Sequence, residues 1–290
     1  MLVETSSVAR ERPPSRRHLA LREIATFAAA YLTYFGVRAV TEGAPWRAFD
    51  NAVALFRFEA DLGLDWEGAI QSVVLRSQLL IDAANAVYIY GHWPVLIGAG
   101  LLLFRYRPRF YYRLRNVCLL TGLVGLVVFA LFPVAPPRLT DLPVVDTITR
   151  DSEGYRQILP PELVNQYAAM PSFHVGWNLL VGLVVFEATR HWLLRTFAIV
   201  MPAAMAFAVV ATANHFVSDV VAGVIIVLVA FAIVRRLEAG RERRRIERGD
   251  ASGCVDEQAR GRALRRGAPR RQRPGAAEHG RGAGAAARRG

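Results

Sequence analysis

The sequence predicts an all-α protein, a six-helix transmembrane bundle followed by a disordered basic tail. Hydrophobic residues make up 53% of the 290 residues, which is high for a soluble protein. Uncharged or weakly charged apolar stretches recur along the chain, each close to the roughly 20 residues that a helix needs to cross a membrane. Of the 36 basic residues, 17 lie from residue 235 onward, so the charge is concentrated at one end.

Six stretches are the candidate membrane helices. They are Leu19–Val40, Leu79–Phe104, Asn116–Ala135, Pro171–Thr189, Leu193–Ala213 and Phe216–Arg236. The third is the clearest because it carries no charge, and the first is the weakest because Arg22, Glu23 and Arg38 flank a short apolar centre. Arginines precede the first stretch as in a signal peptide, but no convincing small-residue cleavage site follows, so we expect a retained helix.

Arginine counts in the short loops predict the orientation. Residues 105–115 hold five Arg and no acid, whereas residues 41–78 and 136–170 carry more acids than arginines. Cytoplasmic loops are the arginine-rich ones. We therefore expect both termini in the cytoplasm, with residues 41–78 and 136–170 on the opposite side.

Three regions follow from this reading: a cytoplasmic segment at 1–18, the six-helix domain at 19–236 and a tail at 237–290. Residues 235–290 carry 17 Arg and 7 acids, which is +10 of the formal net charge of +12. The tail has almost no large apolar residue, so we expect it to be disordered. It either contacts anionic lipid headgroups or is simply solvated. The basic charge describes a tail, so no nucleic acid partner is expected.

The predicted topology brings five polar residues to one outer rim. They come from the end of the third span, the start of the fourth and the turn between the last two: Arg138, Ser172, His174, His215 and Asp219. Ionisable residues at membrane depth are costly and are usually functional. The shared side, more than any one motif, points to an active site.

The spacing of these residues indicates a chemistry. His215 and Asp219 are four apart, so on a helix they share a face, and a carboxylate bonded to one ring nitrogen makes the other a better nucleophile. The helix start at Ser172 favours an anion, and the Arg138 guanidinium suits phosphate oxygens. His174 is placed to protonate a leaving alkoxide. We expect phosphoryl transfer through a phosphohistidine, with no metal and no cofactor.

These residues resemble the type-2 phosphatidic acid phosphatase superfamily, whose signature is K-x6-R-P, then P-S-G-H, then S-R-x5-H-x3-D. "PSFH" at 171–174 resembles the second block, and His215 with Asp219 matches the end of the third. "FPVAPPRL", "AAMPSFHVGW" and "NHFVSDVVAG" are most similar to the branch of inositol phosphorylceramide synthase and its bacterial relatives. The resemblance covers residues 20–236. It implies His215 as nucleophile, Asp219 as its orienting partner and His174 as acid and base.

The resemblance also implies an integral protein of the bacterial plasma membrane that acts on a lipid phosphate ester or a phospholipid. The phosphate is released to water, or a head group such as phosphoinositol passes to a lipid alcohol acceptor. The sequence departs from the signature at the phosphate contacts. It contains no lysine, and Ala208 and Val209 stand where the third block has Ser and Arg. Arg138 is the substitute we expect, and Arg38 is a candidate auxiliary contact. Neither oligomeric state nor native lipid follows from the sequence.

Other interpretations remain open at this point. Ser172 alone reads as a helix-start residue, and His215 with Asp219 as a structural pair. His92 near Pro94 either reaches the site or bonds a carbonyl freed by a kink. The protein as a whole could be a non-catalytic membrane carrier or scaffold for lipid phosphates. Haem or metal binding and a serine hydrolase are weaker, since no zinc motif or G-x-S-x-G elbow is present.

The acids of the first outer loop also have two interpretations. Glu59 and Glu67 could hold a polyol head group, but solvated loop charge is the simpler one.

Overall fold

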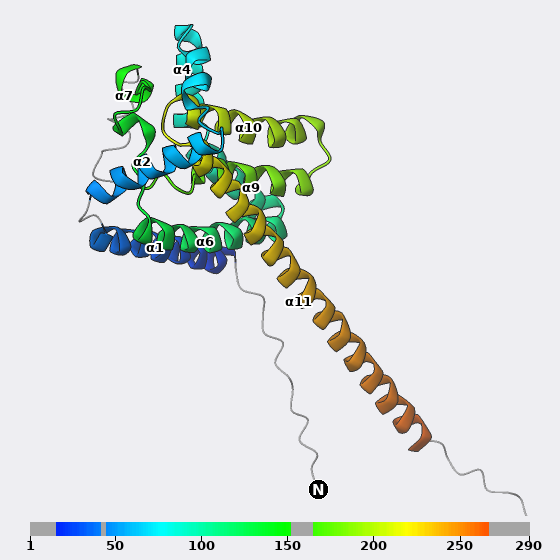
Figure 1. The fold of residues 1–290 in the computed structure, drawn as a ribbon. Helices are drawn as coiled ribbons and strands as arrows, with labels where there is room; N and C mark the ends of the chain where they lie inside the picture. The colour runs from blue at the N-terminus through cyan, green and yellow to red at the C-terminus, as the bar shows by residue number, and fades with distance from the viewer. Residues whose placement is uncertain (1–15, 42–44, 152–164, 267–290) are drawn as a thin grey trace, which may run out of the picture. The chain divides into compact units, whose positions relative to one another are not determined.

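A computed structural model describes residues 16–41, 45–151 and 165–266 (Figure 1). This part of the chain is helical and contains no β-strand, only one isolated bridge between Val134 and Ala168. The all-α prediction is confirmed. The helices are α1 (Arg16–Thr41), α2 (Pro45–Asp61), α3 (Glu67–Val74), α4 (Gln78–Tyr90), α5 (Trp93–Tyr106), α6 (Pro108–Leu131), the 3-10 turn η1 (Pro137–Leu139), α7 (Thr147–Asp151), α9 (Phe173–Ala188), α10 (Trp192–Ala211) and α11 (Val217–Arg266).

Three of these helices are long and apolar enough to cross a membrane: α6, α10 and residues 217–244 of α11. The α4–α5 pair counts as a fourth if its two halves form one bent span, and α9 is a shorter apolar helix of 16 residues. A helix covers each of the six predicted stretches, but the number of six spans and their sidedness stay predictions.

The second predicted stretch differs from the expectation of one kinked helix. It is broken between Tyr90 and Trp93, and α4 and α5 meet there at an angle of 44°. Pro94 explains the break, because proline has no N–H to donate and is accommodated in the first turn of a new helix. His92 therefore lies at a helix junction, where it is buried.

The chain divides into two compact units, residues 1–237 and 238–290. α11 stays helical to Arg266, whereas the sequence predicts disorder from residue 237. The structure differs from that prediction as far as Arg266, and residues 267–290 lie outside the described ones. Lack of large apolar residues excludes a packed core but not a helix, and Arg, Ala and Glu have high helix propensity.

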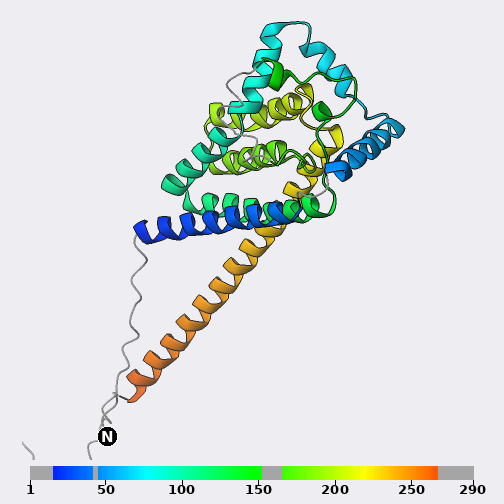
Figure 2. The ribbon, with the colours of Figure 1, turned by 90° about the vertical axis from the view of Figure 1, so that its left-hand side faces the viewer.

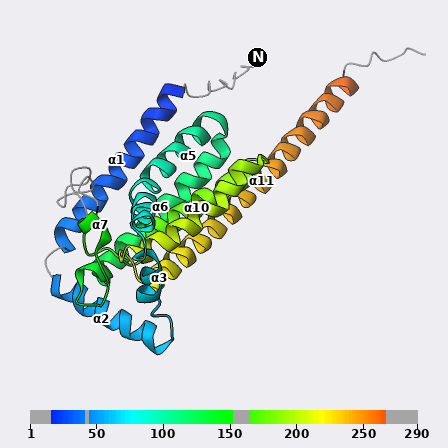
Figure 3. The same cartoon turned by 90° about the horizontal axis from the view of Figure 1, so that it is seen from above.

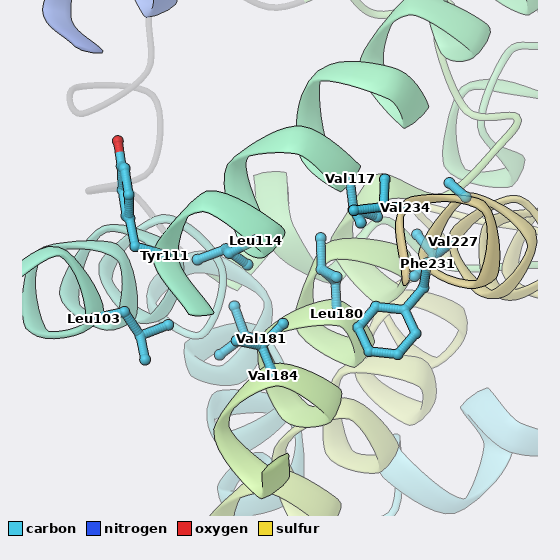
Figure 4. Packing of buried hydrophobic residues seen from close by; sticks show 11 residues of the cluster. Leu103, Tyr111, Leu114, Val117, Leu180, Val181, Val184, Val227, Phe231 and Val234 are labelled. Atoms are coloured by element: carbon cyan, nitrogen blue, oxygen red, sulfur yellow. The ribbon is translucent and has the colours of Figure 1, made fainter. Parts of the chain in front are cut away.

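In the first unit, α1 lies beside α6 (Figures 1 and 2), and α9 packs against α5, α6 and α10. The short helices α2, α3 and α7 gather at one end (Figure 3). A core of buried side chains joins α5, α6, α9 and α11, with Leu180 of α9 lying toward Val117 of α6 and Phe231 of α11 (Figure 4). Close packing of this kind holds helices together in a membrane, where hydrophobic transfer supplies little.

One glycine sets how closely α11 approaches the start of α9. A Cβ at Gly223 would collide with the backbone carbonyl of Ser172, so only glycine fits there. This contact lets the Ser172 N–H donate to the backbone oxygen of Asp219 over 3.0 Å. The "PSFH" segment and the first turn of α11 are thereby joined through the backbone.

Candidate active site

The turn between α10 and α11 positions the His215–Asp219 pair. Nδ1 of His215 lies 3.4 Å from Oδ2 of Asp219. His215 precedes α11, and Asp219 is the third residue of that helix. The two residues therefore do not lie on one continuous helix, which is what the spacing predicted, but their side chains still meet. Both His215 and Asp219 are buried.

Asp219 also caps the helix that carries it. Its Oδ2 accepts a hydrogen bond from the Phe216 N–H at 2.9 Å, as the acid of a capping box does. The turn itself is tight: Ala213 has a φ of 54°, a conformation that few non-glycine residues adopt and that clusters at functional sites. The N–H groups of Asn214 and His215 both donate to the Val209 carbonyl. The same carboxylate oxygen therefore fixes the helix start and faces the imidazole.

His174 lies within reach of this pair. Its ring centroid is 5.8 Å from that of His215 and 4.4 Å from that of His92, and it stacks on Tyr88 at 4.7 Å. Asn178 lies one turn further along α9. Its Nδ2 donates to the backbone carbonyl of His174 and lies 3.4 Å from Nδ1 of His92. The structure thus gathers three histidines, and it brings His92 to the site from the junction of α4 and α5.

Arg138 reaches the same turn from η1. Its backbone N–H donates to the Ala213 carbonyl at 2.9 Å, and its Nε donates to Oδ1 of Asn214 at 2.9 Å. Its Nη1 pairs with Oδ2 of Asp146 at 3.3 Å, while Oδ1 of Asp146 caps α7 by accepting from the Thr149 N–H. The guanidinium is therefore held by Asn214, the residue before His215, and Asp146 occupies part of it.

Ser172 is the N-cap residue of α9, but its hydroxyl makes no cap hydrogen bond. The side chain is fully buried, and within the described ranges its Oγ has no hydrogen-bond partner. Ser172 thus stands at the helix start, as the simpler interpretation has it, but its hydroxyl does not form the capping bond. A buried, uncommitted hydroxyl near Asp219 is suited to bonding a ligand oxygen.

Arg38 lies in the last turn of α1. Its guanidinium lies over the Phe35 ring of its own helix, 5.8 Å from the centroid, and α1 packs on α6. Its predicted role as a phosphate contact stays untested.

Two acids of the predicted outer loop behave unlike solvated charge. Glu59 in α2 and Glu67 in α3 are 0% and 3% exposed. Each accepts a hydrogen bond from the first turn of α11. The interpretation as solvated loop charge is wrong, because α2 and α3 pack these side chains against that turn.

Three positions near the site were missed at the sequence level: Tyr88, Asp146 and Asn214. Asn214 directly precedes His215, which was the available signal, while Asp146 and Tyr88 carry none that stands out. Among the residues described, no group of three or more His, Cys, Asp or Glu side chains is placed to hold a metal ion.

Comparison with known proteins gives one match. A family model described as PAP2 superfamily matches residues 53–233, which include His92, Arg138 and all of the His174–Asp219 site. No curated protein and no solved structure matches.

Proposed function

The chain belongs to the PAP2 superfamily, whose members are phosphatases, and on this premise we propose that it is an integral-membrane enzyme acting on a lipid phosphate ester or phospholipid. The observation that carries the proposal is the convergence of His215, Asp219, His174 and Arg138, from three separate segments, on one buried turn. Histidine nucleophile, orienting carboxylate, acid and phosphate contact are the parts that the reaction needs.

In the proposed first step, Nε2 of His215 attacks phosphorus, because Nδ1 faces Asp219. The bond from phosphorus to the lipid oxygen breaks as the phosphorus–nitrogen bond forms, and His174 donates a proton to the leaving lipid alkoxide. Arg138 and the Ser172 hydroxyl bond the phosphoryl oxygens. Asp219 stabilises the positive charge that grows on the imidazole, as a buried carboxylate does in catalytic triads.

In the second step, an acceptor hydroxyl attacks the phosphohistidine, His174 takes its proton, and the bond to Nε2 breaks. Water as acceptor makes the enzyme a phosphatase. A lipid alcohol as acceptor makes it a head-group transferase, similar to the inositol phosphorylceramide synthase branch. The sparse phosphate contacts fit the transferase version, since Ala208 and Val209 are buried in the helix core where the signature places polar side chains.

The proposal includes the sidedness. We place six spans in a bacterial plasma membrane, with both termini in the cytoplasm and the site near the outer surface. The arginine-rich segment 105–115 supports this orientation. The orientation is tested with variants that carry a single cysteine in the α2–α3 segment. A membrane-impermeant thiol label should react with them in intact cells. Labelling only after lysis would mean that the orientation is the reverse.

The test of activity uses purified protein in detergent with EDTA and a panel of labelled phospholipids and polyprenyl phosphates. Lipid alcohol with an equal amount of free phosphate indicates hydrolysis. Lipid alcohol without free phosphate indicates head-group transfer, and the label should then appear on an added lipid alcohol. His215→Ala should abolish both products. Binding without turnover in the wild-type protein would support the carrier or scaffold alternative instead.

A further inference from the structure

The first turn of α11 is held by three carboxylates. Oδ2 of Asp219 accepts from the Phe216 N–H at 2.9 Å, Oε1 of Glu67 from the Val217 N–H at 2.9 Å, and Oε1 of Glu59 from the Ser218 N–H at 2.5 Å. The first N–H groups of a helix have no partner within the helix, and negative groups there are stabilised by the helix dipole. The turn that carries Asp219 and follows His215 is thus fixed by Glu59 and Glu67 from outside α11.

α2 also contacts the segment that leads into Arg138. The carbonyl of Ala48 accepts from the Ala135 N–H at 3.0 Å, and the Asn51 side chain donates to the Pro133 carbonyl at 2.8 Å. Both bonds end on the segment that leads into Arg138. The apolar face of α2, with Ala52 and Leu55, packs on Phe216. α2 therefore connects the phosphate contact with the nucleophile.

Glu59 and Glu67 are buried too close together for both to be charged without cost. The pKa of Glu59 is raised to about 8, first by burial and also by the neighbouring Glu67, against the lowering effect of the hydrogen bonds from Ser218. In the described part of the chain, the Oε2 atom of each residue has no hydrogen-bond partner. Asp219 lies on the same turn, with His215 beside it. Glu59 therefore keeps its proton to a higher pH than a solvated carboxyl does.

We propose that Glu59 and Glu67 are positioning residues, whose hydrogen bonds to the Ser218 and Val217 amides lock the first turn of α11 and so set the angle at which Asp219 meets His215. The inference deepens the proposed function and rests on it, because it assumes that His215 does the chemistry. We expect neither side chain to contact the substrate, because both are buried and one carboxylate oxygen of each accepts a hydrogen bond from a backbone N–H of α11.

Glu59→Ala and Glu59→Gln separate positioning from simple stability. Alanine removes the acceptor for the Ser218 N–H, and misplacement of catalytic groups by about 1 Å costs on the order of 100-fold. We expect Glu59→Ala to lose that much in kcat with little change in KM. Glutamine keeps an acceptor oxygen and offers a fixed donor to Glu67, so it mimics the protonated carboxyl. Glu59→Gln should retain near wild-type kcat at pH 7.

The pH profile gives the readout that a merely structural role would not move. In the wild-type protein, kcat should fall as the pH rises through about 8, because Glu59 loses its proton and the new charge is buried and repelled by Glu67. Glu59→Gln should lack this fall. Glu23→Gln is the matched control: Glu23 is also buried, bonded to Arg115 and Tyr111 of α6, and its substitution should leave the profile unchanged.

An unchanged alkaline fall in Glu59→Gln would overturn the proposal, as would full activity of Glu59→Ala. Infrared spectroscopy checks the pair without turnover: a protonated-carboxyl band should titrate near pH 8 and vanish in Glu59→Gln, and its absence from the wild-type protein would also overturn the proposal. Failure of the proposed function would give a different result. The wild-type protein and His215→Ala would then be equally inactive, whether or not the infrared band titrates.

Discussion

Replacing Asp219 by Asn tests whether its charge or its hydrogen bonds serve His215. In catalytic triads this change costs about 10⁴ in kcat because the amide imposes the wrong imidazole tautomer. Here the Phe216 N–H donates to the same oxygen that faces His215. It should hold the oxygen of the new Asn in that place, so that Nδ1 keeps its proton. Only the charge is then lost.

The magnitude follows from the difference between charged and neutral hydrogen bonds. A bond to a charged group contributes about 1.5–3 kcal/mol and a neutral one about 0.5–1.5. At a separation of 3.4 Å the smaller values apply, so the difference is about 1 kcal/mol, or about fivefold in kcat. We therefore expect Asp219→Asn to lower kcat about fivefold and to leave the melting temperature near that of the wild-type protein.

Asp219→Ala is the companion variant. It leaves the buried Phe216 N–H without its side-chain acceptor, which costs about 1–3 kcal/mol, so both kcat and melting temperature should fall further than in Asp219→Asn. The assay is single-turnover release of labelled lipid alcohol, with thermal melting in detergent beside it. A loss near 10⁴ in Asp219→Asn would refute the reasoning, because it would mean that Phe216 does not fix the amide. A loss under twofold would remove the charge from the mechanism.

Four substitutions have further defined outcomes. Asp146→Asn keeps an oxygen that accepts from the Thr149 N–H at the start of α7, but it removes the negative charge that pairs with Arg138. Steady-state kinetics should therefore show a KM several-fold lower. Arg138→Ala should instead raise KM and lower kcat. Gly223→Ala places a methyl group against the Ser172 carbonyl and should destabilise the fold by about 1–3 kcal/mol, seen in thermal melting. Because folding raises the pKa of Glu59 from 4.5 to about 8, stability should fall as pH rises between these values and level off above them; melting of Glu59→Gln should show a weaker pH dependence.

The sequence predicted which candidate residues lie close together better than it predicted the local structure that holds them. His215 and Asp219 could be paired because a spacing of four is local, and the observed pairing survives although His215 lies in a turn. Motif spacing placed His174 beside them. The break at His92 could be predicted only in part. Pro94 indicates a kink, but the angle between α4 and α5 depends on how these helices pack, and local sequence does not specify that packing.

Glu59 and Glu67 show why other parts could not be predicted. Their hydrogen-bond partners in α11 are 159 and 150 residues away in the chain, and in sequence they are two acids among several in a polar segment. Burial of a carboxylate is favourable only when specific donors are present. Such donors appear only once α2 and α3 are folded against α11, so the local sequence reads as solvated loop.

The charges around the site constrain how an anionic substrate is captured. Arg138 is paired with Asp146, and Asp219 faces His215. Because the Arg138 guanidinium already has a carboxylate partner, a phosphate group that binds it has to displace Asp146 or share the guanidinium with it. Loss of the proton from Glu59 above about pH 8 would add a negative charge behind Asp219. The proton on Glu59 thus supports substrate capture as well as the geometry of His215, and the two effects separate as KM and kcat in the pH profile.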